Sequence, residues 1–348
     1  MRCRLSYILM EGDPTMAHLL SQKEIRSISR RFRLQALRSM PVSTLYQKNA
    51  VIQIQTNLGT FALKPYKRNP HLRSGLAAQM KTAAKYVRLL MNNAYGFMPD
   101  WLPADSGKLW IMRQGKPFYM TEWIHGPPLG AEQDYEQLGH ALAKLHTLRC
   151  GLPHSPQSAT LEQVRLWKVK DHLLRKNMVQ ASSVSPTLRR AIKKYGAAWK
   201  RLSDEAWSEI RHPDISRICA QEKTNPALIH GDITPPNVII ANDGRLHIID
   251  WDFIRVGSTY ADTAKTIMNT TGFNTTFMEA FLRGYEGIRP LSPPERRLIK
   301  ALYGLPREAW YAVRFPRSKR SAEMLKTIDQ TWTLRRQAME YMSRWANP

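Results

Sequence analysis

Polar and apolar residues alternate in the first third of the chain, whereas most of the rest follows a helical period. Residues 51–56 (VIQIQT) alternate with a period of two, and the turn at residues 57–59 leads into a second short strand that ends at Lys64. Residues 109–112 and 118–124 predict another strand pair around Gln114 and Gly115. These segments predict a small antiparallel sheet.

The remaining apolar positions recur every three or four residues, which predicts a mainly helical second part. Ser21 and Glu24 form a capping-box pattern before a basic amphipathic helix with Ile25, Ile28, Phe32 and Leu37 on its apolar face. The sequence Gly126-Pro127-Pro128 is typical of a hinge. Further helices are expected at residues 71–93, 135–148, 161–178, 186–210, 262–269, 274–285, 293–314 and 322–345.

One β-hairpin interrupts the helical part, at residues 227–252. Two apolar runs, residues 237–241 and 246–249, flank the sequence Asn242-Asp243-Gly244. Asn and Asp followed by Gly tolerate the positive φ that a tight turn needs, so this segment predicts two short paired strands.

Three polar residues lie at the edges of this hairpin. Asp232 precedes the first strand, Asn237 opens it, and Asp250 ends the second strand. We expect the two carboxylates and the amide to converge at one end of the hairpin. Oxygen ligands of this kind suit Mg²⁺, which binds one or two carboxylates together with substrate phosphates.

The chain is strongly basic, with 52 Lys and Arg against 28 Asp and Glu and a formal net charge of +24. A field of this sign attracts polyanions such as acidic polymers or nucleotides, although a solvated basic surface explains the charge equally well. No helix-turn-helix signal or recurrent aromatic–basic motif is present, so nucleic acid is not an expected partner.

The three cysteines are widely separated and show no C-x-x-C spacing, which argues against a disulfide framework and favours a reducing, cytoplasmic setting. No apolar run is long enough to span a membrane. Residues 1–17 contain two further methionines that could be the start of translation, so residues 1–20 are treated as an extension without structural weight.

The order of a small β-rich part, a hinge and a larger helical part resembles the two-lobed protein-kinase-like fold, an α+β fold. The resemblance is closest to the aminoglycoside phosphotransferase (APH) and choline-kinase-like branch. HGDITPPN (residues 230–237) is similar to its H-G-D-x-x-x-x-N loop, and IIDWD (residues 248–252) to its metal motif. The resemblance implies an N-lobe at residues 21–124 and a C-lobe at residues 125–348 that carries the catalytic hairpin.

Within this branch, TNLGTFALK, TEWIHG and IIDWDF resemble CotS-type spore-coat proteins of endospore-forming bacteria. The segment YADTA (residues 260–264) also resembles the start of the helix that follows the metal motif in the branch. This finer resemblance implies an association with sporulation and the spore coat, with spore-coat proteins or acidic polymers as partners.

The resemblance implies a role for each matched residue in ATP-dependent phosphoryl transfer to a hydroxyl acceptor. Asp232 would orient or deprotonate the acceptor hydroxyl, with His230 supporting the catalytic loop, although a satisfied core histidine is an equal interpretation of His230. Asn237 and Asp250 would hold Mg²⁺. The cofactor ATP would be bound by Lys64 at its phosphates and by the backbone of Glu122 and Ile124 at its adenine. Asp252 would help to orient the metal-binding residues without binding the metal directly. Trp123 is expected in the core.

Two departures from the family pattern leave a second interpretation open. Residues 65–99 contain no Asp or Glu to hold Lys64, and Gln79 or a water is the available substitute. The expected phosphate-covering loop, residues 41–50, contains no glycine, which leaves Ser43, Thr44 and Lys48 to contact phosphates. The alternative is therefore a catalytically weak or inactive kinase-like structural protein of the spore coat.

The acceptor is not identified by the sequence. In this fold it is set by the helical part, around residues 155–215 and 265–345, which is basic overall. A basic lining favours an anionic sugar or polymer over an aminoglycoside.

Overall fold

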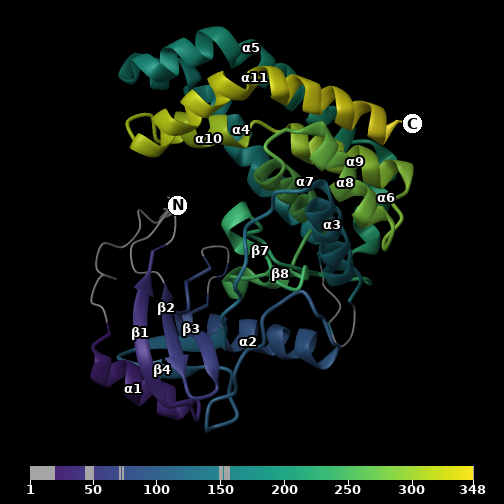
Figure 1. Ribbon diagram of the computed structural model, residues 1–348. Coiled ribbons are helices and arrows are strands. Elements are labelled where there is room, and N and C mark those ends of the chain that lie inside the picture. The colour runs from purple at the N-terminus through teal and green to yellow at the C-terminus, as the bar shows by residue number, and fades with distance from the viewer. Residues whose placement is uncertain are drawn as a thin grey trace, which may run out of the picture. The chain divides into compact units, whose positions relative to one another are not determined.

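A computed structural model describes residues 20–43, 51–69, 72, 74–148, 152 and 157–347. It forms two units, residues 1–130 with 234–255 and residues 131–233 with 256–348. The first unit holds the β-sheet and the second is helical, which confirms the expected kinase-like α+β fold (Figure 1). The contacts group the hairpin with the sheet unit, which differs from the lobe division at residues 124 and 125 expected from the sequence.

The first unit contains a five-stranded antiparallel sheet with the strand order β1-β2-β3-β5-β4. The pairs expected from alternation are present, β2 with β3 and β4 with β5. The strands are β1 (Ala36–Val42), β2 (Val51–Thr56), β3 (Gly59–Pro65), β4 (Ile111–Arg113) and β5 (Lys116–Glu122). Lys64 pairs with Tyr119 in the register of β3 and β5.

Helix α1 (Gln22–Arg31) covers part of the sheet and begins with the expected capping box at Ser21. Ile25 and Ile28 pack against a core that includes Met120. The prediction that this helix reaches Leu37 was wrong, because the chain turns at residues 32–35 and Leu37 lies exposed in β1. β1 also includes residues 41 and 42 of the expected phosphate-covering loop, and residues 44–50 lie outside the described part.

Helix α2 (Leu76–Asn92) follows β3 and buries Met80, Val87 and Leu90. It begins later than the expected residue 71, with Gly75 as its N-cap. Residues 70, 71 and 73 lie outside the described part of the chain, so the start expected there is not described.

The hairpin predicted at residues 227–252 is confirmed as β7 (Val238–Ile240) and β8 (Leu246–Ile248), with Gly244 at φ +81° in the turn. Asn237 ends a 3₁₀ turn, η2 (Pro235–Asn237), and does not open the strand as expected. A second turn, η3 (Trp251–Phe253), follows Asp250.

Two backbone hydrogen bonds attach the hairpin to the rest of the first unit. The Ile240 N–H donates to the Pro127 carbonyl at 2.9 Å and the Ile248 N–H to the Phe97 carbonyl at 2.7 Å. A Cβ added at Gly126 would lie 1.8 Å from the Ile240 carbonyl oxygen, so only glycine fits at this point of the hinge.

The second unit begins with helix α3 (Glu132–Thr147), whose widest contact is with α8 (Thr275–Glu286). Gly139 of α3 and Gly284 of α8 permit close packing, because a Cβ at either would lie 2.0 Å from a backbone oxygen of the facing helix. Helices α4, α5, α10 and α11 lie alongside one another (Figure 1). The remaining elements are α4 (Ala159–Val184), α5 (Pro186–Ile210), α6 (Pro213–Gln221), β6 (Leu228–Ile229), β9 (Arg255–Val256), α7 (Thr259–Thr270), α9 (Pro293–Gly304), α10 (Arg307–Arg314) and α11 (Lys319–Ala346).

The prediction of a single helix at residues 293–314 was wrong. The chain leaves the helical conformation at Leu305 and Pro306 and forms two helices, α9 and α10. Helix α5 has the bounds that its pattern predicted. Helix α6 was not predicted, because His212 and Pro213 open it within what reads as a loop.

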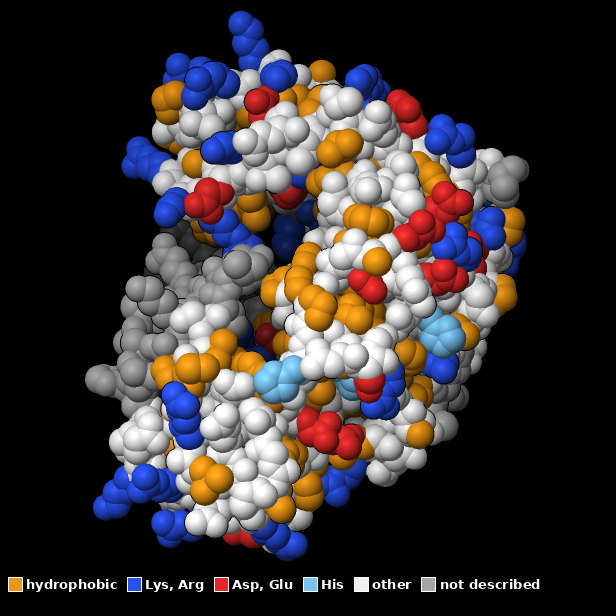
Figure 2. All heavy atoms as spheres, in the orientation of Figure 1, with side chains coloured by type: hydrophobic (Ala, Val, Ile, Leu, Met, Phe, Trp, Pro, Cys, Tyr) orange, Lys and Arg blue, Asp and Glu red, His pale blue; other side chains and the backbone are white. Residues whose placement is uncertain are grey.

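Lys and Arg side chains lie across the face shown in Figure 2, with smaller groups of Asp and Glu among them. Within the described ranges, none of the helices has the length and apolar character required to span a membrane.

Candidate active site

Lys64 lies in a buried cluster of charges in the first unit. Its Nζ donates to the Asp252 carboxylate at 3.0 Å and also contacts Asp250. Burial alone would lower the pKa of Lys64, but the charges of Asp250 and Asp252 outweigh burial and raise it. Lys64 is therefore a cation at neutral pH, available to nucleotide phosphates.

This pairing replaces the contact that sequence reasoning assigned to Gln79. Gln79 is 1% exposed and is occupied by backbone groups of the β3–α2 connection. Its oxygen accepts from the Asn69 N–H at 2.8 Å, and its amide donates to the carbonyls of Leu72 and Ser74. The suggestion that Gln79 holds Lys64 was wrong.

Asp252 is fully buried and anchors the connection after β3. Its Oδ2 accepts from the Lys67 N–H at 3.2 Å, and its backbone oxygen accepts from the Tyr66 hydroxyl at 3.0 Å. Its Oδ1 is a buried atom without a partner in the described part of the chain. Burial raises the pKa of Asp252 to about 6, and nearby Lys64 only partly opposes this effect.

Asp250 and Asn237 lie at the same end of the hairpin. The Ile249 N–H donates to the Asn237 carbonyl at 2.9 Å, which places Asn237 next to the residue that precedes Asp250. Asp250 adopts the left-handed conformation at φ +66° and ψ +57°, which is costly for an aspartate and is concentrated at functional positions in proteins. Its carboxylate keeps 17% of its side-chain surface exposed.

These residues fit a magnesium ion that is completed by a ligand. Asn237 and Asp250 supply the oxygen donors that Mg²⁺ prefers, and Asp250 is partly open to solvent. Over the described ranges, no group of three His, Cys, Asp or Glu side chains forms a closed metal site. An ion held here would need phosphate or water oxygens for most of its coordination.

The predicted adenine-binding residues end strand β5 in the first unit. The Glu122 N–H donates to the Asp100 carbonyl at 3.0 Å, and the Trp123 N–H donates to the Thr60 carbonyl at 3.1 Å. The Ile124 backbone makes no hydrogen bond within the described part of the chain. Its N–H and carbonyl are thus available to a planar ligand edge. Trp123, expected in the core, is only half-buried.

In the second unit, Asp262 holds the loop that carries the other predicted catalytic residues. Asp262 accepts from the backbone N–H groups of His230, at 3.2 Å, and Gly231, at 3.1 Å. Gly231 has φ +83°, a conformation that favours glycine. Burial alone would raise the pKa of Asp262, but the hydrogen bond with His146 and the charge of nearby Lys265 lower it. Asp262 is therefore a buried anion.

His146 lies behind this carboxylate. Its Nε2 is 3.3 Å from Asp262 and its Nδ1 is 2.8 Å from the Tyr285 hydroxyl. Burial lowers the pKa of His146 despite the opposing carboxylate, so the ring is neutral at pH 7. A neutral ring donates from Nε2 to Asp262 and accepts from Tyr285.

His230 is fully buried, and its Nδ1 accepts from the Asp232 N–H at 3.3 Å. It shapes the turn that presents Asp232. This position favours an orienting role for His230 over direct contact with a substrate.

Lys265 is the residue that sequence reasoning missed. Its Nζ donates to the Gly231 carbonyl at 2.6 Å and to Asp232 Oδ1 at 3.1 Å. Asn269 of the same helix donates to the Ile233 carbonyl at 3.2 Å. Asp262, Lys265 and Asn269 thus form one polar stripe on α7 that binds the whole loop. Their spacing of three and four residues in a mostly buried helix is the sequence signal that could have revealed them.

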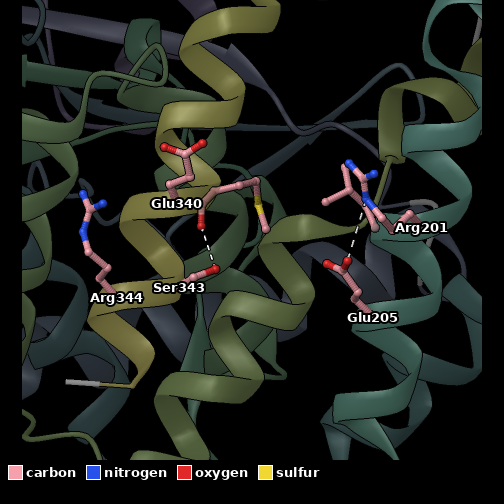
Figure 3. Close-up of a pocket in the computed structure, with 7 residues that line it drawn as sticks. Arg201, Glu205, Glu340, Ser343 and Arg344 are labelled. Atoms are coloured by element: carbon pink, nitrogen blue, oxygen red, sulfur yellow. Dashed lines mark hydrogen bonds and ion pairs between the residues drawn. The ribbon is translucent and has the colours of Figure 1, made fainter.

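Two cavities in the second unit lie away from this loop. One, of about 390 Å³, is lined by residues of α5 and α11 that include Arg201, Glu205, Ser343 and Arg344 (Figure 3). The other, of about 130 Å³, is lined by residues that include His146, Glu222 and Arg289. Neither is lined by a predicted site residue.

The kinase-like fold, with a lysine and two aspartates in its sheet unit and an aspartate-bearing loop in its helical unit, defines a phosphotransferase-type protein. The sequence model of the phosphotransferase enzyme family (APH) matches residues 47–299, so the chain belongs to this family. Family membership confirms the expected assignment to enzymes that transfer phosphoryl groups to hydroxyls.

Solved structures agree with this fold. An aminoglycoside phosphotransferase from Alicyclobacillus acidocaldarius is similar over 96% of this chain and 98% of its own, with a TM-score of 0.78 and 14% identity. Spectinomycin phosphotransferase APH(9)-Ia, in complex with ADP and spectinomycin, covers 95% of this chain and 96% of its own, with a TM-score of 0.61 and 15% identity. A choline kinase from Cryptosporidium parvum is similar over 90% of this chain and 94% of its own, with a TM-score of 0.52 and 9% identity. Comparison with curated proteins gave no match.

Proposed function

We propose that the protein transfers the γ-phosphoryl group of ATP to a hydroxyl acceptor with the help of Mg²⁺. The observation that carries the proposal is the buried Lys64, kept cationic by Asp250 and Asp252 in the unit that also holds Asn237. ADP is bound by a solved relative of the same fold, which supports ATP as the donor.

The nucleotide would be held by the first unit. Lys64 would contact the phosphates, and the open backbone of Ile124, with the Glu122 carbonyl, would meet the adenine edge. Asn237 and Asp250 would bind Mg²⁺, which neutralises charge on the phosphates during transfer. With phosphates at Lys64, Asp250 would be available to the metal, while Asp252 would keep its buried contact with the ammonium.

The acceptor would be positioned by the second unit. Asp232 would accept the hydroxyl proton or hold the hydroxyl in line, and one placed carboxylate suffices because phosphoryl transfer depends mainly on positioning and charge. Asp232 and Asn237 are five positions apart, which limits their Cα separation to about 18 Å along an extended chain.

The finer resemblance to CotS-type proteins supports a further part of the proposal. We place the protein in the cytoplasm of a sporulating cell or in the spore coat, with coat proteins or acidic polymers as partners. The net charge of +24 supports a polyanionic neighbour. Polyanion binding that does not weaken as salt rises would contradict this part.

The enzyme activity is tested by ATP binding and turnover. ATP with Mg²⁺ should raise the melting temperature, and ATP hydrolysis or transfer should fall about a hundredfold or more in Asp250→Ala and Asp232→Asn. Asp243→Asn is the matched control, because Asp243 lies in the exposed hairpin turn and pairs with the nearby Arg245. Absence of any ATP-dependent shift, with Asp250→Ala indistinguishable from wild type, would refute the proposal.

A further inference from the structure

Three helices of the second unit meet around Arg307, the first residue of α10. The Arg307 guanidinium lies 5.4 Å from the ring centroid of Trp167 on α4. Its Nη2 lies 3.0 Å from Met268 Sδ on α7. Helix α4 also contacts both α7 and α10. The start of α10 is therefore packed against these two helices.

Helical spacing adds three more cations to this region. Lys170 lies three residues after Trp167, and Lys265 lies three residues before Met268, so each shares a face with the residue that contacts Arg307. Arg314 lies seven residues after Arg307, two turns along the same face of α10. We call Lys170, Lys265, Arg307 and Arg314 the basic cluster.

The charges of this cluster act on one another. The largest effect on Lys170 is the loss of water around its ammonium group, which lowers its pKa. The positive charges of Arg314, Arg307 and Lys265 lower this pKa further. Burial lowers the pKa of Arg307 to about 10, and Glu308 and Tyr303 only partly oppose this effect. With a pKa of about 10, the Arg307 guanidinium still carries positive charge at neutral pH.

The neighbouring carboxylates are committed elsewhere. Glu308 binds Arg335 through two hydrogen bonds of 2.6 and 2.9 Å. Asp171, the residue after Lys170, accepts from Trp207 and Trp310 at 2.9 and 3.1 Å and is further bound by other side chains. Neither neutralises the cluster.

Three groups near the cluster lack a partner within the described ranges. Lys170 forms no hydrogen bond or ion pair there, and its side chain is exposed. The buried Nε of Arg307 and the buried hydroxyl of Tyr303 also lack partners there. Lys265 joins the cluster to an acid, Asp232. Within the described ranges, Lys170 and Arg307 form no ion pair, so both are cations available to an anion near the residue proposed to receive the acceptor hydroxyl.

We infer that the acceptor is a hydroxyl compound that carries a phosphate monoester, and that Lys170, Arg307 and Arg314 bind this phosphate while Lys265 spans the phosphate and Asp232. The role of this compound as acceptor rests on the proposed function, whereas the binding of its phosphate to the basic cluster does not. A phosphate dianion matches several cations better than a carboxylate does, and a guanidinium binds it with two parallel hydrogen bonds. Cationic acceptors such as aminoglycosides or choline would meet repulsion here.

Binding is tested on the full chain with glycerol 3-phosphate, with glycerate as the carboxylate counterpart and glycerol as the neutral one. Calorimetric titrations are run with and without saturating ADP and Mg²⁺, so that phosphate binding in the nucleotide site is blocked in one arm. Glycerol 3-phosphate should bind in both arms, more tightly than glycerate and far more tightly than glycerol, and more weakly at high salt.

Two variants and a control assign the binding to the cluster. Lys170→Gln should weaken binding of glycerol 3-phosphate about tenfold. Arg307→Lys keeps the positive charge but loses the two parallel hydrogen bonds of the guanidinium, and it should weaken binding similarly. Lys168→Gln changes an exposed lysine on the opposite face of α4 and should leave the affinity unchanged. Equal affinity in Lys170→Gln and wild type, equal or tighter binding of glycerate, or preferred binding of kanamycin would each overturn the inference.

Turnover distinguishes this inference from the proposed function. If ATP neither binds nor reacts but Lys170→Gln still weakens phosphate binding, the activity is wrong and the anion site stands. If ATP is consumed and the cluster variants bind as wild type does, the activity stands and the acceptor assignment is wrong.

Discussion

The buried Asp252 should make the free energy of unfolding depend on pH, and the substitution Asp252→Asn should abolish this contribution. Asp252 lies beside Asp250 and Lys64, and Lys67 lies 3.7 Å from Asp250, so two carboxylates share the buried ammonium of Lys64. The fully buried Asp252 is the group that takes up a proton. Asp252→Asn keeps an oxygen that can accept from Lys64 and from the Lys67 N–H, but it does not titrate.

The magnitude follows from the pKa of Asp252 in the two states. Its pKa is raised from 3.8 to about 6 by burial, so the folded protein binds this proton more tightly than the unfolded chain does. The stabilising contribution is therefore full below pH 4 and is lost as pH rises through about 6. Between pH 4.5 and 7.5 the loss is about 2 kcal/mol.

The assay is urea unfolding of wild type and Asp252→Asn at several pH values across this window. The free energy of unfolding of the variant, relative to that of wild type, should rise by about 2 kcal/mol from pH 4.5 to 7.5. Other shifted groups, such as Glu222, whose pKa is raised by burial, are present in both proteins and cancel. Hydrogen exchange of peptides from β8 and η3 would localise the effect. A difference that does not change with pH would refute the reasoning.

Three further substitutions test the packing of the second unit. Lys265→Met should lower kcat about tenfold or more while leaving the KM for ATP unchanged, because it removes the two hydrogen bonds of Lys265 with the loop that carries Asp232; an unchanged kcat in steady-state assays would contradict this role. Asp262→Ala should lower the free energy of unfolding by about 3–5 kcal/mol, because it leaves two loop N–H groups and a buried histidine without their acceptor; a loss below about 1 kcal/mol in thermal unfolding would count against it. Gly139→Ala should lower the free energy of unfolding by about 3 kcal/mol, because the added Cβ would lie 2.0 Å from the Phe281 carbonyl oxygen. Gly96→Ala, with open space around it, should change this free energy by less than about 0.5 kcal/mol. Equal effects of the two substitutions would refute the packing argument.

Local signals in the sequence were sufficient where one segment determines the outcome. The Asn242-Asp243-Gly244 turn identified its hairpin, because the positive φ of Gly244 is a local requirement. Helix α5 begins at Pro186 after its cap Ser185, a start signal that needs no tertiary partner. These features are encoded within a few neighbouring residues.

The partners of buried charges were not predictable in the same way. Lys64 and Asp252 are 188 positions apart, and no periodicity links them. Gln79 was suggested for Lys64 because it lies in the following helix, yet it binds backbone groups five to ten residues away. The stripe on α7 was overlooked because Lys265 reads as an ordinary surface residue until its contact with Asp232 is known.

The contacts of Lys64 change the meaning of the missing acid in helix α2. From the sequence, the absence of an acidic residue there favoured a weak or inactive protein, because the neutral Gln79 or a water would hold the lysine less strongly than an ion pair does. In the structure, Asp252 supplies that carboxylate from the segment after the hairpin, where it is fully buried. Asp250 can therefore move from Lys64 to a metal without leaving the ammonium unpaired. The residue that holds the lysine and the residue proposed to bind the metal are thus two positions apart, so a chain without an acid in α2 keeps the charged lysine that the proposed phosphoryl transfer requires.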